Sequence, residues 1–258
     1  MRLTAADLDV ECLGSGPTVV LVHGSIVGAE RSWRKQRELA EEWTLCLPNR
    51  PGFGDSPELE RGDFDREAPL IAELLGDTSH LIGHSYGAVI ALLAAALRPE
   101  AVRSLTVSEP GLLRLAAGDP VADAMIAHGE EMYRRAPEAP PRDFLLAFRS
   151  GVHSAHETPE ELPDWLERGA RHAARERPPW HAEVPWEALA ETRFPKLVIS
   201  GDHSPVFEAV CDHVVERLGG AERAIISGRQ HTIPATGEAY NTCVHEFLTR
   251  AEQGARGA

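Results

Sequence analysis

One stretch of the chain restricts its possible folds more than any other: Ser79-His80-Leu81-Ile82-Gly83-His84-Ser85-Tyr86-Gly87-Ala88-Val89-Ile90. It runs from a short apolar strand through Gly-x-Ser-x-Gly into a segment rich in Ala and Leu, so Ser85 falls on the bend between strand and helix. Such a bend holds its middle residue at positive φ, and the crossing backbones leave room only for small residues two positions away on either side. Gly83 and Gly87 provide that room. We therefore predict a strained turn that presents the Ser85 hydroxyl.

The sequence around this turn predicts the fold. A Gly-x-Ser-x-Gly pentapeptide arises by chance in about one chain in ten of this length, so its context matters. The continuous β-branched run at 18–22 is typical of a strand covered on both faces of a parallel sheet, and 102–107 and 196–200 are expected to be further strands. Helical patterns, such as the one at 30–42, alternate with these expected strands. The alternation predicts an α/β fold with a doubly wound, mostly parallel sheet.

The domain organisation follows from where the strand patterns stop. No convincing strand occurs between residues 112 and 190, whereas several helical patterns separated by prolines do. We expect one α/β core built from residues 1–111 and 191–250, with a helical lid at 112–190. A total of 258 residues suits one domain with an insertion. The small, polar residues 251–258 predict a flexible tail.

Charge and composition narrow the expected partners. The chain has 26 basic and 40 acidic residues, a formal charge of −14, which argues against nucleic acids and anionic membranes as partners. No leader-like apolar segment opens the chain, and no run approaches the ~18 apolar residues of a membrane span. We expect a cytoplasmic protein whose partner is a small-molecule substrate, and a homodimer stays an open option.

Neither a metal nor a cofactor is expected from the sequence. The four cysteines are scattered without the spacing of metal ligands or redox pairs: Cys12, Cys46, Cys211 and Cys243. No glycine-rich phosphate loop occurs either. The expected chemistry therefore depends on side chains alone.

At this point the chain resembles the α/β-hydrolase fold family. The matching features are Val19-Val20-Leu21-Val22-His23-Gly24, Arg50-Pro51-Gly52-Phe53-Gly54-Asp55-Ser56, Gly83-His84-Ser85-Tyr86-Gly87 and the late Gly228-Arg229-Gln230-His231. The resemblance covers almost the whole chain outside the lid. It implies a serine hydrolase whose partners occur in the order Ser, acid, His.

The expected base is His231. A serine attacks a carbonyl only if a base takes its proton, and that base needs an acceptor to fix its tautomer. His231, one of twelve histidines, follows the last expected strand and precedes the last expected helix. That is the family's position for the base. His203, near the mouth of the same site, is the alternative.

The acid departs from the commonest family pattern. Many relatives place it in Gly-x-x-Asp-Pro, which corresponds here to Gly201-Asp202-His203-Ser204-Pro205, so Ser204 stands where the aspartate would be. A serine cannot hold a negative charge against an imidazolium. Some members, among them zearalenone-type lactone hydrolases, instead carry a glutamate after the strand that follows the nucleophile helix. This resemblance favours Glu109 as the acid, with Asp202 as the alternative.

The remaining site residues are expected around the turn. The Tyr86 N–H at the start of the helix and the Ser25 N–H after His23-Gly24 should form the oxyanion hole, with the Ile26 N–H as the alternative to Ser25. Ile26, Trp165 and Trp180 are the expected substrate-binding residues, and the lid's aromatic side chains favour an apolar substrate.

These residues predict a cofactor-independent serine hydrolase that cleaves an ester or lactone of a small, largely apolar substrate through an acyl-enzyme. Cleavage of C–C or amide bonds by the same side chains is one alternative. Another is a ligand-binding receptor or a weakly catalytic homologue, because the aspartate expected at Ser204 is missing. Dehalogenases and epoxide hydrolases of this fold use an aspartate nucleophile, so Ser85 argues against both.

Overall fold

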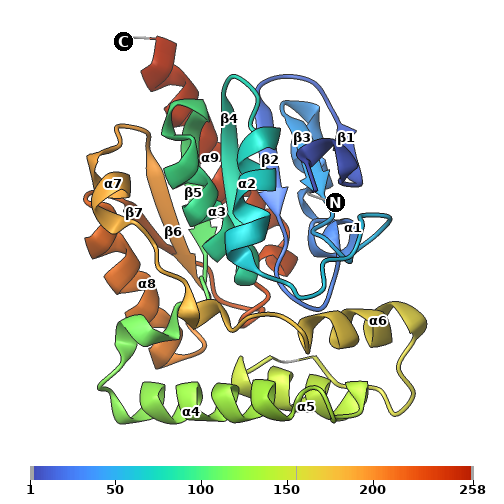
Figure 1. Ribbon diagram of the computed structural model, residues 1–258. Coiled ribbons are helices and arrows are strands. Elements are labelled where there is room, and N and C mark those ends of the chain that lie inside the picture. Colours follow the sequence, from blue (N-terminus) through green and yellow to red (C-terminus); the bar gives the residue numbers. More distant parts are fainter. Residues whose placement is uncertain (1–2, 155, 257–258) are drawn as a thin grey trace.

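The structure, a computed structural model, describes residues 3–154 and 156–256. Its centre is a seven-stranded sheet in the order β1-β3-β2-β4-β5-β6-β7 (Figure 1). The strands are β1 (Val10–Leu13), β2 (Thr18–Val22), β3 (Thr44–Pro48), β4 (Ser79–His84), β5 (Val102–Ser108), β6 (Lys196–Ser200) and β7 (Glu222–Ile225). β1 runs antiparallel to β3, and the other described pairs are parallel. The order turns back between β2 and β4, which confirms the doubly wound sheet.

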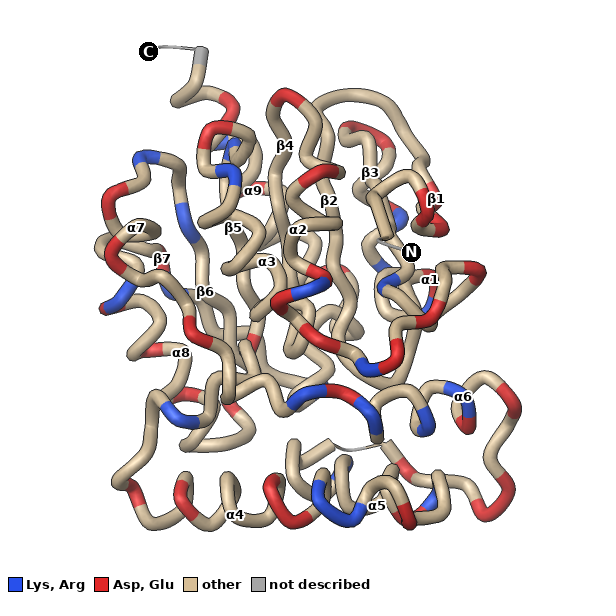
Figure 2. The backbone as a smooth tube through the Cα atoms, viewed as in Figure 1, with Lys and Arg blue, Asp and Glu red and all other residues tan. Residues whose placement is uncertain are grey.

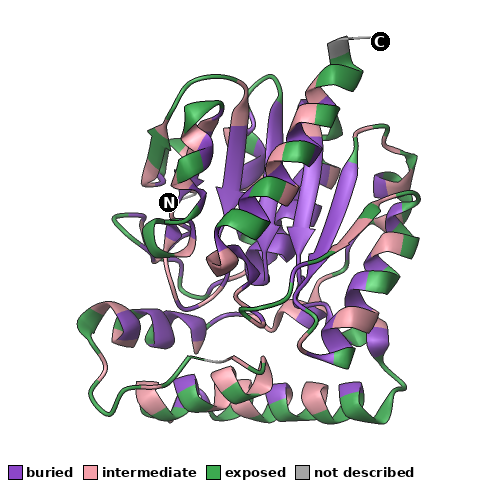
Figure 3. Ribbon diagram, turned by 180° about the vertical axis from the view of Figure 1, so that it is seen from behind, coloured by how far each residue is buried: buried purple, intermediate pink, exposed green. Residues whose placement is uncertain are grey.

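Helices cover both faces of the sheet. One face carries α2 (Phe64–Leu74), α3 (Tyr86–Leu97) and α8 (Pro205–Leu218), with α7 (Trp186–Glu191) beside α8; the other carries α1 (Ala29–Ser32) and α9 (Glu238–Arg256). The four residues from Val19 to Val22 in β2 are apolar because their side chains pack against both faces of the sheet. Val20 and Val22 pack into the core on the first face, whereas Val19 and Leu21 pack into the core on the second. The central strands are accordingly buried (Figure 3).

Short 3-10 helices fill many of the connections. They are η1 (Ala5–Asp7), η2 (Gln36–Glu41), η3 (Pro99–Ala101), η4 (Leu113–Ala116), η5 (Pro179–His181) and η6 (Ile233–Thr236). The helical pattern expected at 30–42 is divided between α1 and η2. The break places the fully buried Gln36 side chain against η6 and α9, where its amide nitrogen donates to the Pro234 carbonyl and to the Asn241 side chain, both at 2.9 Å.

A helical insertion lies across the carboxyl ends of the strands (Figure 1). It consists of α4 (Pro120–Arg135), α5 (Pro141–Gly151) and α6 (Asp164–Ala173), which follow β5 and precede β6. These helices share a small apolar core that includes Phe144, Leu145 and Leu166. They also carry charges of both signs, whereas β2 and β4 carry no lysine, arginine, aspartate or glutamate (Figure 2).

The structure corrects the prediction of a flexible tail at residues 251–258. α9 continues to Arg256, so residues 251–256 are helical, while residues 257 and 258 lie outside the described part of the chain. Ala, Glu, Gln and Arg all favour helix, and Ala251 is still buried, so the end of the chain extends the packed helix. At 19 residues α9 is too polar to cross a bilayer, and none of the other described helices meets that requirement.

Candidate active site

Ser85 occupies the turn between β4 and α3 with φ 56°, as the motif predicts. A Cβ at Gly83 would lie 2.5 Å from the Gly87 carbonyl oxygen, and a Cβ at Gly87 would lie 2.3 Å from the Val22 carbonyl oxygen. Both obstacles are backbone atoms that cannot move aside. The glycines therefore allow the crossing of β2, β4 and α3 that holds Ser85 at positive φ.

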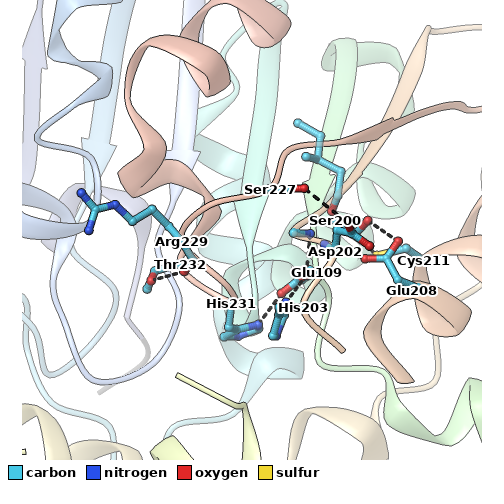
Figure 4. A network of polar contacts seen from close by, with 12 residues as sticks. Glu109, Ser200, Asp202, His203, Glu208, Cys211, Ser227, Arg229, His231 and Thr232 are labelled. Atoms are coloured by element: carbon cyan, nitrogen blue, oxygen red, sulfur yellow. Dashed lines mark hydrogen bonds and ion pairs between the residues drawn. The ribbon is translucent and has the colours of Figure 1, made fainter. Parts of the chain in front are cut away.

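Ser85, His231 and Glu109 form one continuous chain of hydrogen bonds. His231 Nε2 lies 2.8 Å from Ser85 Oγ. On the other side of the ring, His231 Nδ1 lies 2.7 Å from Glu109 Oε2 (Figure 4). All three side chains are buried. A carboxylate can only accept, so Nδ1 carries the ring proton and Nε2 is free to accept from the serine hydroxyl. This tautomer is the one that a general base beside Ser85 requires.

Glu109 follows β5 and is held there by both its backbone and its carboxylate. Its N–H donates to the Ile199 carbonyl at 3.0 Å, and the Gly201 N–H donates to Oε1 at 2.8 Å. Burial by itself would raise the pKa of this carboxyl, but contacts with His203 and His231 outweigh it and hold the pKa at about 2. Glu109 is therefore a carboxylate at neutral pH, able to balance a positive charge on His231.

Asp202, the alternative acid, lies away from the imidazole. The Ser227 hydroxyl donates to the Asp202 carboxylate at 3.4 Å. The Asp202 backbone N–H donates to the Glu208 carboxylate at 2.9 Å (Figure 4). Ser204, at the family's aspartate position, is the residue that precedes α8. The geometry thus brings Glu109, and not Asp202, to His231.

His203, the alternative base, contacts the acid and, among the described residues, makes no hydrogen bond with Ser85. Its Nδ1 lies 3.2 Å from Glu109 Oε1, the carboxylate oxygen that His231 does not contact, although without the direction of a hydrogen bond. Its ring stacks on Phe207 with centroids 5.5 Å apart. His203 therefore belongs to the surroundings of Glu109.

His84 supports the loop that carries His231. Burial, with His231 nearby, lowers the pKa of His84 to about 4, so the ring is neutral at pH 7. Its Nε2–H donates to the His231 carbonyl oxygen at 2.7 Å. The histidine of the pentapeptide thus fixes the backbone of the candidate base.

The two residues expected to form the oxyanion hole both lie beside Ser85. Ser25 and Tyr86 both line the cavity there, and a Cβ at Gly24 would lie only 3.1 Å from Ser85 Cβ. Within the described residues, neither the Ser25 nor the Tyr86 N–H donates a hydrogen bond. The pair can therefore receive a negatively charged oxygen at the reacting carbon.

A buried ion network fixes the Ser25 loop, and the sequence did not reveal it. Arg50, with no exposed surface, donates to Glu67 at 2.7 Å, to Glu176 at 2.8 Å and to the Gly24 carbonyl at 2.9 Å. Burial raises the pKa of Glu176 although Arg50 lies beside it. The Ser25 hydroxyl also donates to Glu176. The Arg50-Pro51-Gly52 motif is a signal for one member of this network, whereas no motif marks Glu176.

The cavity at Ser85 is narrow, about 50 Å³, and mostly apolar. The core contributes Ser25, Ser85, Tyr86, Gly111, Phe207 and His231, and the lid contributes Leu113, Met125, His128, Gly129, Met132, Tyr133, Phe148, Gly151, Val152, Pro179 and Trp180. Among these lid residues, Trp180 was expected to bind substrate, and Tyr133 and Phe148 belong to the lid's aromatic side chains that favoured an apolar pocket. Helical spacing on α4 could have indicated Met125, Gly129 and Met132, because positions three and four apart share a face.

Two expected substrate-binding residues do not line this cavity. The Arg31 guanidinium of α1 lies over Trp165, 4.1 Å from the ring centroid, because the position of Trp165 on α6 faces α1. Ile26 packs into the lid core, and its carbonyl lies so close to α6 that a Cβ at Gly169 would overlap it. Trp180 does line the cavity, and its Nε1–H donates to Glu130 at 2.8 Å.

The sequence of this chain is similar to those of known hydrolases. Residues 19–251 match the model of the Alpha/beta hydrolase family. Over 101 residues, 39% of this chain and 40% of the relative, the sequence is 38% identical to a pimeloyl-[acyl-carrier protein] methyl ester esterase of Chromobacterium violaceum. Over 187 residues, 67% of this chain and 65% of the relative, it is 30% identical to the esterase of that name from Methylococcus capsulatus. The chain thus spans less than two thirds of these relatives.

A solved structure is similar over nearly the whole chain. An alpha/beta hydrolase from Sphaerobacter thermophilus superposes with a TM-score of 0.70 at 22% identity, covering 96% of this chain and 100% of the other. At that identity the likeness supports the fold alone.

Proposed function

The chain belongs to the alpha/beta hydrolase family, and from this premise we propose that it is a cofactor-independent serine esterase acting on a small, largely apolar ester. The observation that carries the proposal is the continuous contact from Ser85 through His231 to the ionised Glu109. The similarity to two methyl ester esterases supports an ester as the substrate.

Acylation would begin at Ser85. Its Oγ attacks the ester carbonyl carbon while His231 Nε2 takes the hydroxyl proton, and the Glu109 carboxylate balances the imidazolium that results. The carbonyl oxygen becomes an oxyanion and accepts from the Ser25 and Tyr86 N–H groups. Each such donor typically contributes ~3 kcal/mol to lowering the barrier. The C–O bond to the leaving alcohol then breaks, and the alcohol leaves with the proton from His231.

Water would complete the cycle. His231 Nε2 removes a proton from a water molecule, which attacks the acyl carbon of the Ser85 ester, and the same two N–H groups bind the second oxyanion. Collapse of that intermediate returns the proton to Ser85 Oγ and releases the acid. The account uses only side chains and backbone of this chain.

The cavity supports a short acyl group. Its volume of about 50 Å³ is far below the roughly 300–1,000 Å³ of sites that enclose drug-sized ligands. Met125 and Met132 have flexible thioether side chains that can adapt to a slightly larger group. We therefore expect acetyl and propionyl esters to react better than long-chain esters.

A panel of p-nitrophenyl esters of graded chain length, together with macrocyclic lactones, tests this proposal. We expect kcat/KM to be highest for the shortest acyl chains and to fall as the chain lengthens. If the enzyme prefers a lactone, the proposed substrate class changes, but the roles proposed for Ser85, His231 and Glu109 stay the same. Tight binding of these compounds without turnover would favour the ligand-receptor alternative and contradict the proposal.

Trp180 offers a direct test of the cavity, with Trp165 as its control. Because Trp180→Phe enlarges the space beside Ser85, we expect the preferred acyl chain to lengthen by one or two carbons. Trp165→Phe removes a similar ring outside the cavity and should leave the preference unchanged. Equal shifts in both variants would contradict the assignment of this cavity to the acyl group.

A further inference from the structure

Glu109 lies between two imidazoles. His231 Nδ1 lies 2.7 Å from Oε2, and His203 Nδ1 lies 3.2 Å from Oε1 (Figure 4). One donor atom from each of the three residues falls within 4.8 Å of the others. They come from three separate segments, the loops after β5, β6 and β7, so the sheet brings them together at its carboxyl edge.

His203 is the unexplained member of this cluster. Only 5% of its side chain is exposed, yet neither ring nitrogen makes a hydrogen bond within the described residues. Buried polar atoms without a partner are uncommon in folded proteins. The proposed ester hydrolysis assigns no step to His203, so its position beside Glu109 calls for another role.

The three donors suit a zinc ion. Two imidazole nitrogens and a carboxylate oxygen are ligands that Zn²⁺ takes at about 2.0–2.2 Å in a tetrahedral arrangement, which separates the donors by roughly 3.3 Å. His231 Nδ1 lies 2.7 Å from Oε2 and His203 Nδ1 lies 3.2 Å from Oε1, and one donor atom from each residue lies within 4.8 Å of the other two. Small shifts of these side chains would therefore bring three donors to the tetrahedral spacing. We propose that Glu109, His203 and His231 form a reversible zinc site that switches the enzyme off. The switching part rests on the proposed function, whereas the binding part does not.

Zinc would block the base by changing its tautomer. When the metal binds His231 Nδ1, the ring proton moves to Nε2, so Nε2 donates and can no longer accept the proton of Ser85. The Glu109 charge is engaged by the metal at the same time. His203 does not line the cavity, so an ester can still enter. We therefore expect zinc to lower kcat and to leave KM nearly unchanged.

Calorimetry on Ser85→Ala tests the site without relying on activity. Titration with zinc chloride should show one tight site, and the added change His203→Asn should weaken its affinity by about tenfold or more, because one of three ligands is lost. The control is His153→Asn, since His153 is an exposed lid histidine whose ring centroid lies 6.4 Å from that of His203. Equal affinity in all three proteins, or no tight site, would overturn the zinc site.

Kinetics then test the switch. In otherwise wild-type enzyme, micromolar zinc should lower kcat on p-nitrophenyl acetate at least tenfold, EDTA should restore it, and His203→Asn should require a higher zinc concentration for the same loss. Zinc binding in calorimetry without loss of kcat would overturn the switch and leave the esterase proposal standing. No esterase activity before zinc is added would contradict the proposed function, while the calorimetric result still decides the site.

Discussion

Glu109 carries its charge with no exposed surface, which is costly unless the carboxylate is well supplied with donors. The Gly201 N–H and the His231 Nδ1–H provide them, one on each oxygen. The arrangement fixes both the ionised state of Glu109 and the tautomer of His231. Its hydrogen-bond partners, more than its residue type, therefore make Glu109 suitable as the acid.

Replacing Glu109 with glutamine should lower kcat on p-nitrophenyl acetate by about 10³–10⁴-fold, because the amide can donate to Nδ1 and favours the wrong tautomer. Asp202→Asn, the matched control, should change kcat by less than about threefold, since Asp202 contacts Ser227 and not His231. A larger loss in the Asp202 variant would refute Glu109 as the acid.

The residues that sequence predicted best are those fixed by backbone geometry. Ser85 is indicated by the two glycines around it, and the resemblance to the α/β-hydrolase family implies Glu109 and His231 at their positions after strands. Ile26 and Trp165 were wrong as cavity residues because lid packing, which no motif encodes, decides which side chains face Ser85. The contact of His203 with Glu109 was likewise invisible, since it depends on how two loops meet.

Among the elements, the crossing of β2, β4 and α3 leaves the least room for change. A Cβ at Gly87 would lie 2.3 Å from the Val22 carbonyl and 2.4 Å from the His23 carbonyl, and both are backbone atoms. Gly254, in α9, has open space around its Cβ position. The two glycines therefore make a matched pair for a test by alanine.

We expect Gly87→Ala to destabilise the fold by about 1–3 kcal/mol or to prevent folding, because the added methyl overlaps β2. Gly254→Ala should instead raise the unfolding free energy by up to about 1 kcal/mol through helix propensity. Urea titrations of both variants measure the difference. A Gly87→Ala protein as stable and as active as wild type would show that the crossing is looser than described.

Strands were easier to predict than helix ends. The strands expected at 18–22 and 196–200 coincide with β2 and β6, because burial on both faces makes their central residues apolar. The pattern at 30–42 became two short helices, since the Gln36 contacts with η6 and α9 are tertiary. The tail expected from residue 251 is part of α9 because packing of Ala251 carries the helix onward.

For the protein as a whole, several buried histidines link stability to pH. Burial, with Arg103 nearby, lowers the pKa of His80 to about 4, and burial likewise lowers those of His84 to about 4 and His172 to about 3. The unfolded chain takes up protons at these histidines near pH 6.5, before the folded protein does. Stability contributed by neutral histidines is therefore present above about pH 6.5 and falls as the pH drops towards 4.

His80→Asn tests this link. The variant should lose less unfolding free energy than wild type between pH 7 and 4, by on the order of 3 kcal/mol, because one lowered pKa is removed. Asparagine can keep a hydrogen bond to Ser104, which lies 2.7 Å from His80 Nδ1. His213→Asn, at a side chain that is 46% exposed, serves as the control. Parallel pH curves for His80→Asn and wild type would contradict the expectation.

Glu109 makes stability depend on pH in a lower range than the histidines do. Its pKa of about 2 lies below the ordinary value of 4.5, so the stability that it contributes is present above about pH 4.5 and is lost as the pH falls towards 2. The loss of stability between pH 6.5 and 4.5 therefore reports the histidines and not Glu109.

The overall architecture was predictable because strand and helix patterns alternate along almost the whole core. The size of the cavity was not, since a space of about 50 Å³ depends on how lid side chains fill it. The sequence therefore supported a prediction of the fold and of the kind of reaction, but not of the size of the substrate.

The rate at which a fluorophosphonate labels Ser85 tests the central claim most directly, with the modified residue identified by mass spectrometry of peptides. Wild type should react rapidly and to one equivalent at Ser85, and His231→Ala should slow labelling by about 10³-fold or more because the base is removed. Labelling at another serine, or at the same rate in both proteins, would contradict it.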